Sequence, residues 1–203
     1  IKNTSYDQFY DEHAYVFSIL ALNNLLQVTE LEIFDIEKLT THGGSNRVFI
    51  KKKKSNKTIT DNVIEIINEE LNMGMDKFET YQKFAQNVIN SKNETIKIFT
   101  ELKKKNAKII GYGATYKSST ILNYCGLDTK FIDYFTDTTE NKQGKFTPGT
   151  HIPIFKPTDE INIEINHIFL GAWNFKKEIF NKEKKFIERG GKFISHVPYP
   201  QII

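Results

Sequence analysis

Four consecutive residues near the amino terminus, Tyr10-Asp11-Glu12-His13, have the side chains that proton transfer requires. A histidine accepts or releases a proton near neutral pH, and a carboxylate or phenol beside it can orient it or a substrate. The same residues also occur by chance at an exposed helix start. Taken alone, the cluster therefore leaves both interpretations open.

A glycine turn, Gly111-Tyr112-Gly113, follows an apolar run that begins at Ala107 and predicts a buried strand. Ligands of open α/β sheets bind at the carboxyl ends of the strands, where glycine lets the backbone approach a phosphate. Lys117 adds a positive charge in the first turn of the next predicted helix. The turn predicts either a ligand site or a structural tight turn.

As a dinucleotide fingerprint this turn is incomplete, because Tyr116 stands where the third glycine of G-x-G-x-x-G would be. Asp133 does lie about 20 residues further on, where such folds place an acidic residue. A nicotinamide-dependent oxidoreductase therefore stays an alternative, and Tyr116 argues against it.

A polar loop of about 15 residues, Asp137–His151, leads into Ile152-Pro153-Ile154. Loops of this length are uncommon in compact domains and are often functional. Because the loop follows a predicted strand, we expect it to lie beside the glycine turn, at the same edge of the sheet.

The first half of the chain predicts a helix, two strands and two more helices. Apolar spacing indicates a helix near Phe17–Leu26, and alternation indicates strands at Leu31–Ile36 and Asn46–Ile50. A short helix near Asn62–Leu71 follows, with its cap at Thr60-Asp61. A long helix then begins at Asp76, with an apolar stripe that reaches Leu102.

After Ala107, strands and helices alternate, which predicts a parallel sheet of the Rossmann-like α/β class. The carboxyl-terminal helix is expected to be capped by Asn174 and ended by Gly190-Gly191, and Gly126 is expected at a helix end. The expected elements are a helix at Tyr116–Cys125, strands at Phe131–Phe135, Ile152–Ile154 and Ile165–Ala172, a helix at Phe175–Glu188 and a strand at Lys192–His196.

Composition narrows the function classes. The net charge is +3 and the only arginines are Arg47 and Arg189, so the lysine runs read as solvated faces rather than a nucleic-acid surface. No apolar run approaches the roughly 20 residues of a membrane helix. The single cysteine, Cys125, excludes an intrachain disulfide and a multi-cysteine zinc site, and the histidines lack metal-ligand spacing, so no metal site is expected. A cytoplasmic location is the default expectation.

Several runs together resemble one family, the S-adenosylmethionine-dependent C-methyltransferases of nucleotide-linked 4-keto-deoxysugars. The run at Tyr6–His13 resembles the family's segment ending in Y-H-E-H, and His42–Arg47 resembles its h-G-G-S-l-R segment. Further runs recur in the same order in its carboxyl-terminal domain, namely Gly111–Ala114, Lys142–Gly144, Pro148–Pro153 and Ala172–Asn174.

The resemblance implies deprotonation of the carbon next to the ketone, followed by attack of the enolate on the donor methyl group. His13 matches the base, Glu12 would orient this base or a sugar hydroxyl, and Tyr10 would donate a hydrogen bond to the enolate oxygen. The residues that match motifs for the nucleotide sugar and its phosphates are Gly111, Gly113, Ala114, Lys117, Asp137 and Lys142.

Two positions depart from the family pattern. Asp11 replaces the first histidine of Y-H-E-H, which leaves the presumed base intact. The run Thr115–Ser118 stands where the family tends to have Pro-Ala-Lys-Gly, which makes the turn bulkier and puts the details of phosphate binding in doubt.

The resemblance also implies three segments: residues 1–54 as the tail of a methyltransferase-type domain, 55–105 as a helical linker, and 106–203 as the Rossmann-like domain. By this comparison the chain is a fragment, inactive alone. The S-adenosylmethionine site and a zinc-binding cysteine domain would lie outside it. A third possibility is a non-catalytic module that binds nucleotide sugars or serves assembly.

Overall fold

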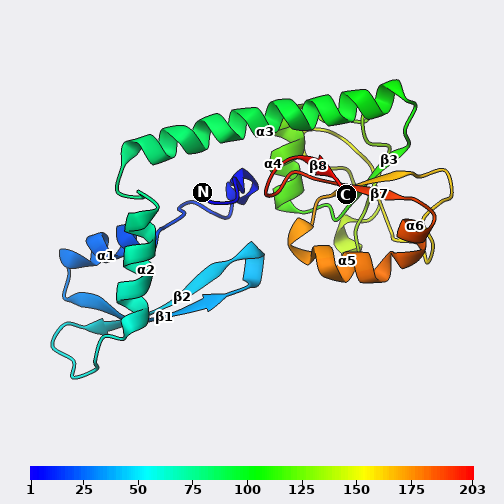
Figure 1. Cartoon of the computed structure of the whole chain (residues 1–203). Coiled ribbons are helices and arrows are strands. Elements are labelled where there is room, and N and C mark those ends of the chain that lie inside the picture. Colours follow the sequence, from blue (N-terminus) through cyan, green and yellow to red (C-terminus); the bar gives the residue numbers. More distant parts are fainter. The chain divides into compact units, whose positions relative to one another are not determined.

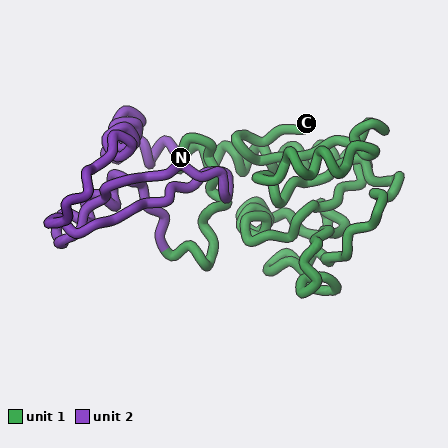
Figure 2. The backbone as a smooth tube through the Cα atoms, turned by 90° about the horizontal axis from the view of Figure 1, so that it is seen from below, with its two compact units in different colours: residues 1–14, 85–203 green, residues 15–84 purple.

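The computed structural model describes all residues from Ile1 to Ile203. The chain forms two compact units (Figure 2): residues 15–84 make the smaller one, and residues 1–14 together with 85–203 make the larger one. Helix α3 (Phe78–Lys104) begins in the smaller unit and continues in the larger. The compact units are defined by contacts within the fold, whereas the three segments expected in the sequence come from the resemblance to a family. The expected segments therefore stay a prediction.

The smaller unit packs two helices on a hairpin. Strands β1 (Leu31–Leu39) and β2 (Ser45–Lys52) are antiparallel, and helices α1 (Ile19–Gln27) and α2 (Asp61–Asn72) contact β1 and each other. Glu70 accepts hydrogen bonds from the first two backbone N–H groups of α1, where a carboxylate also complements the helix dipole. The shared apolar core consists of Ile19, Leu26, Ile33, Ile36, Val63 and Ile66.

The larger unit contains a six-stranded sheet in the order β5-β4-β3-β6-β7-β8. All neighbouring pairs are parallel except β7–β8. This is the Rossmann order 3-2-1-4-5-6, so the direction of winding reverses between β3 and β6. The strands are β3 (Ile109–Tyr112), β4 (Phe135–Thr136), β5 (Ile154–Phe155), β6 (His167–Leu170), β7 (Lys192–Ser195) and β8 (Gln201–Ile202). The predicted Rossmann-like α/β class is confirmed.

Helices cover both faces of this sheet (Figure 1), with α4 (Tyr116–Cys125) and the last turns of α3 on one side and α5 (Lys176–Lys182) and α6 (Lys184–Glu188) on the other. Because side chains alternate along a strand, β6 serves both layers. Ile168 and Leu170 pack in the cluster with Phe186 of α6, whereas the ring of Phe169 lies 5.7 Å from that of Phe99 on α3. No helix of the structure combines the length and the apolar character needed to cross a membrane.

Several predicted elements differ from the observed ones. Only Phe135 of the predicted strand Phe131–Phe135 is in β4, because the N–H groups of Phe131 and Ile132 bond back to Asp128 in a turn. The predicted helix Phe175–Glu188 is broken at Glu183, and Asn174 is not its cap, since it lies in a short 3-10 turn, Trp173–Phe175. Strand β8 was not predicted from the sequence. The other 3-10 turns are Tyr6–Gln8, Thr41–Gly43 and Glu140–Lys142.

The glycines of the turn after β3 are required by packing within the chain. A Cβ atom on Gly111 would lie 2.3 Å from the ring of Phe135 on β4. Gly113 has φ +83° and its Cβ would lie 2.8 Å from that of Ala172, in the turn after β6. These contacts bring the ends of β3, β4 and β6 close together, which supplies a structural reason for the motif whether or not a ligand binds there.

We expect Gly111→Ala to destabilise the chain by about 3 kcal/mol, because the added methyl group meets a ring that is itself fully buried. Gly190→Ala is the control, since its Cβ would meet nothing within 4 Å and only its φ of +87° disfavours alanine, at about 1 kcal/mol. Urea unfolding followed by circular dichroism measures both. Equal losses would contradict the packing explanation.

Candidate functional site

A pocket of about 370 Å³ opens at the carboxyl ends of β3 and β4, beside the turn after β6. Its walls come from the glycine turn, the start of the long polar loop, the segment after β5 and helix α5. The residues that line it are Tyr112, Gly113, Thr115, Thr136, Asp137, Thr138, Thr139, Lys142, Pro157, Ala172, Phe175, Glu178, Ile179 and Lys182. The predicted proximity of the polar loop to the glycine turn is therefore observed.

Asp137 and Lys142 join the loop to the glycine turn. The Asp137 side chain is nearly buried; its Oδ1 accepts the Thr139 N–H at 2.8 Å and its Oδ2 lies 3.3 Å from Lys142 Nζ. Lys142 Nζ also donates to the carbonyl of Ala114 at 2.8 Å. Both side chains therefore have partners inside the chain and hold the wall of the pocket in place.

Tyr112 closes the opposite wall by donating its hydroxyl to Glu183 at 3.0 Å. Burial and the Glu183 carboxylate raise the pKa of the Tyr112 phenol. The hydroxyl therefore stays protonated at physiological pH and keeps this hydrogen bond.

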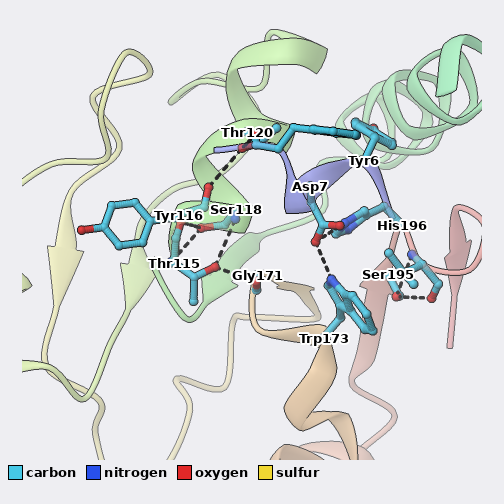
Figure 3. Close-up of polar contacts among 12 residues, drawn as sticks. Tyr6, Asp7, Thr115, Tyr116, Ser118, Thr120, Gly171, Trp173, Ser195 and His196 are labelled. Carbon is cyan, nitrogen blue, oxygen red and sulfur yellow. Dashed lines mark hydrogen bonds and ion pairs between the residues drawn. The ribbon is translucent and has the colours of Figure 1, made fainter. Parts of the chain in front are cut away.

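The amino terminus of α4 is capped by its own side chains (Figure 3). Thr115 Oγ1 accepts the Ser118 N–H at 3.1 Å, and Ser118 Oγ accepts the Thr115 N–H at 2.9 Å. Thr115 Oγ1 also donates to the Gly171 carbonyl. Because this capping box uses one of the first N–H groups of the helix, fewer are left for a phosphate than in an uncapped turn.

Residues 1–14 lie against α4 and the sheet edge, although more than 100 residues separate them in sequence. The ring of Tyr6 meets Tyr124 edge-on at 5.5 Å, and its hydroxyl lies 3.8 Å from the sulfur of Cys125. The hydroxyl of Thr120 donates to the carbonyl of Phe9 at 3.1 Å. The first segment of the chain is thus part of the carboxyl-terminal unit.

The centre of this docking is Asp7, which is completely buried. Its Oδ2 accepts the indole N–H of Trp173 at 2.5 Å and lies 3.2 Å from Nε2 of His196, as Figure 3 shows. Trp173 comes shortly after β6 and His196 directly after β7. One carboxylate therefore connects the amino-terminal segment to the ends of two strands of the sheet.

Lys117 is part of the same buried cluster and does not line the pocket. Its Nζ lies 5.0 Å from the centre of the Trp173 ring. Burial lowers the pKa of the Lys117 amine, while the nearby Asp7 carboxylate acts in the opposite direction. The structure thus places Lys117 outside the pocket that Gly113, Asp137 and Lys142 line.

The predicted catalytic residues follow Asp7 along the same segment. The ring of Tyr10 stacks on Tyr116 at 5.5 Å and lies 4.0 Å from that of His13. Nδ1 of His13 lies 2.7 Å from the Gln8 carbonyl, and only as a donor can it satisfy that oxygen. Neutral His13 therefore has Nε2 as its acceptor, which is the tautomer that a general base needs.

Glu12 is exposed and makes no hydrogen bond to His13. The carbonyl of Gln8 orients the imidazole instead, so of the two expected roles only contact with a sugar hydroxyl is left for Glu12. Partial burial and the Glu12 and Asp7 carboxylates raise the pKa of the Tyr10 phenol, which keeps it a hydrogen-bond donor.

The structure therefore sorts the predicted residues into groups. Gly113, Asp137 and Lys142 meet at the pocket, with Ala114 bound to Lys142 beside it, while Gly111 is packed inside the sheet. Tyr10 and His13 form a second group at Tyr116, the residue after Thr115 of the pocket wall.

Sequence reasoning did not identify the buried group of Asp7, Trp173 and His196. Asp7 and Trp173 do lie in the runs that resemble the family. Nothing in a single sequence, however, indicates that these two side chains form a hydrogen bond. No group of three or more His, Cys, Asp or Glu side chains in the structure is arranged to hold a metal ion.

Comparison with known proteins places the chain in a family. Residues 40–198 match the family model described as the C-methyltransferase C-terminal domain. The chain is also similar to the C-methyltransferase NovU of Streptomyces niveus, with 33% identity over 203 residues. The alignment covers 100% of this chain and 48% of that protein, so the chain spans about half the length of its curated relative.

We expect Asp7→Ala to release residues 1–14 from the sheet edge at a cost of about 1–3 kcal/mol, the usual penalty when a buried donor, here the Trp173 indole N–H, is left without its acceptor. Trp173 is the only tryptophan and loses its hydrogen-bond partner, so its fluorescence should shift to longer wavelength and chymotrypsin should cleave at Tyr6. Asp11→Ala changes an exposed carboxylate of the same segment and is the control. Unchanged emission and protease resistance in Asp7→Ala would contradict the docking role.

Proposed function

The chain belongs to the family of the C-methyltransferase C-terminal domain, and we propose that it forms the substrate side of an S-adenosylmethionine-dependent sugar C-methyltransferase. The substrate is a nucleotide-linked 4-keto-deoxysugar, methylated at a ring carbon next to the ketone. The observation that carries the proposal is that the His13 cluster and the pocket belong to one compact unit. A base and a ligand pocket on the same unit can act on one substrate without rearrangement of the fold.

The chemistry assigned to these residues is formation of an enolate. Nε2 of His13 accepts the proton, and the electron pair of the broken C–H bond moves toward the ketone oxygen. The hydroxyl of Tyr10, kept protonated by its surroundings, donates a hydrogen bond to that oxygen as negative charge develops. Exposed Glu12 is available to a sugar hydroxyl.

The methyl group that the enolate takes up comes from S-adenosylmethionine, whose site we assign outside these residues. The glycine turn of this chain does not fit the donor, because Gly113 is packed against Ala172 and the next helix is capped by Thr115 and Ser118. The zinc implied by the resemblance likewise has no ligand group here.

In the whole enzyme, we expect His13→Ala to lower methyl transfer by about 10²- to 10⁴-fold, the usual contribution of a general base. The specific measurement is deuterium uptake from D₂O at the carbon next to the ketone, followed by NMR without the methyl donor. This exchange should fall in parallel with methyl transfer. Asp11→Ala, two residues away and exposed, should leave both rates unchanged. Full exchange in His13→Ala would refute the base assignment.

Tyr10→Phe keeps the ring that stacks on Tyr116 and removes only the hydroxyl. We expect methyl transfer to fall by about 10²-fold, as for other lost donors to a developing oxyanion, with KM little changed. Steady-state kinetics in the whole enzyme measure this. Tyr116→Phe removes the hydroxyl of the stacked partner and is the matched control; an equal loss in both variants would show that the effect is not specific to the Tyr10 hydroxyl.

A further inference from the structure

Tyr10 and His13 lie on a segment without regular secondary structure. Residues 9–18 belong to no helix or strand, and a turn, in which the His13 N–H donates to the Tyr10 carbonyl at 2.8 Å, joins the two residues. No ladder of backbone hydrogen bonds therefore fixes the direction of the two side chains. Since a displacement of about 1 Å can cost a catalytic group about 10²-fold in rate, the pair needs contacts from a rigid neighbour.

A stack of three rings connects this pair to helix α4. The imidazole of His13 lies 4.0 Å from the ring of Tyr10, with 32° between their planes. The ring of Tyr10 lies 5.5 Å from that of Tyr116, with their planes only 12° apart, which is an offset-stacked arrangement that aromatic pairs prefer. Tyr116 is the first residue of α4, a helix fixed by its capping box and by the fully buried Ile121 and Leu122. The base is thus linked to the core through two rings.

Thr120, one turn further along α4, holds the backbone of the same segment. Its hydroxyl donates to the carbonyl of Phe9, the residue before Tyr10, at 3.1 Å, and Figure 3 shows Thr120 and Tyr116 on this helix. The two contacts restrict different degrees of freedom. The hydrogen bond fixes where the backbone of Tyr10 begins, whereas the stack with Tyr116 restricts the rotation of the Tyr10 side chain.

Packing in the core does not account for Tyr116. Its side chain is 56% exposed, although the next two residues, Lys117 and Ser118, are buried. An exposed ring stabilises the core little, so its contribution lies in the contact with Tyr10. Tyr116 also belongs to the run Thr115–Ser118, in which this chain departs from the family pattern, so the resemblance implies no role for its ring.

We propose that Tyr116 is a positioning residue for the proposed reaction. It holds Tyr10 in the side-chain conformation in which the Tyr10 ring supports the imidazole of His13, so that the hydrogen-bond donor and the base keep a fixed spacing. Tyr116 acts through Tyr10 and takes no part in proton transfer. This inference rests on the proposed function, because it takes Tyr10 and His13 to be the catalytic pair.

In the whole enzyme, we expect Tyr116→Ala to lower kcat for methyl transfer and the rate of deuterium uptake about tenfold each, with KM little changed. Tenfold corresponds to about 1.4 kcal/mol, the upper end of the energies of stacked aromatic pairs, and a lost stack can reduce the fraction of correctly positioned enzyme by no more than that. Tyr116→Phe should restore both rates, because only the ring is required. Tyr116→Leu, which supplies apolar volume without a ring, should not restore them.

Tyr199→Ala is the matched control. It makes the same change at another tyrosine of the larger unit that is 61% exposed, and it should leave both rates unchanged. Circular dichroism establishes that each variant is folded.

The position of the imidazole can be measured without substrate, by NMR of the 203-residue chain with labelled histidines. Because His13 lies against the ring of Tyr10, its Cε1–H resonance should be displaced by the ring current. It should move toward the value of an exposed histidine in Tyr116→Ala and stay in place in Tyr116→Phe. The chain has five histidines, and the resonance that disappears in His13→Ala assigns the signal.

The inference would be overturned by an unmoved His13 resonance in Tyr116→Ala, by unchanged rates in that variant, or by rates that fall equally in Tyr116→Ala and Tyr116→Phe. Rates that Tyr116→Leu restores would also overturn it, since bulk would then suffice. Full deuterium uptake in His13→Ala would instead count against the proposed function, whatever the Tyr116 variants do.

Discussion

The buried carboxylate of Asp7 is the constraint on which the candidate site depends. A buried polar group is costly unless it has a partner, and the Asp7 carboxyl group finds the indole N–H of Trp173, with Nε2 of His196 3.2 Å away, only at this place in the fold. The segment that contains it is therefore held at the ends of β6 and β7. Because His13 is six residues away on the same segment, the location of the proposed base follows from this pairing.

The same pairing divides the edge of the sheet. Asp7 and His196 are buried at the ends of β6 and β7, whereas the pocket with Asp137 and Lys142 in its wall lies at the ends of β3 and β4.

Much of the fold was predictable because local signals and tertiary structure agree. Helix α4 was predicted with its observed bounds, and Gly126 after it has the left-handed conformation expected of a helix end. The predictions of strands failed where contacts between distant residues, rather than local strand propensity, decide the backbone conformation. The strand expected at Phe131–Phe135 is reduced to two residues, and β8 forms only because the chain returns antiparallel to β7. Such pairings depend on partners that are distant in sequence.

The sequence alone determined the alternation that makes a Rossmann-like sheet, the order of motifs that identifies the family, and the nature of the residues in the Tyr10–His13 and Asp137–Lys142 groups. The tertiary structure decided which of them meet. It joined Asp7 to a tryptophan 166 residues away, buried Lys117 outside the pocket and placed Asp137, not Asp133, in the pocket wall. The physical reason is that propensity and spacing act over a few residues, whereas a hydrogen bond between buried side chains 166 residues apart forms only in the folded chain.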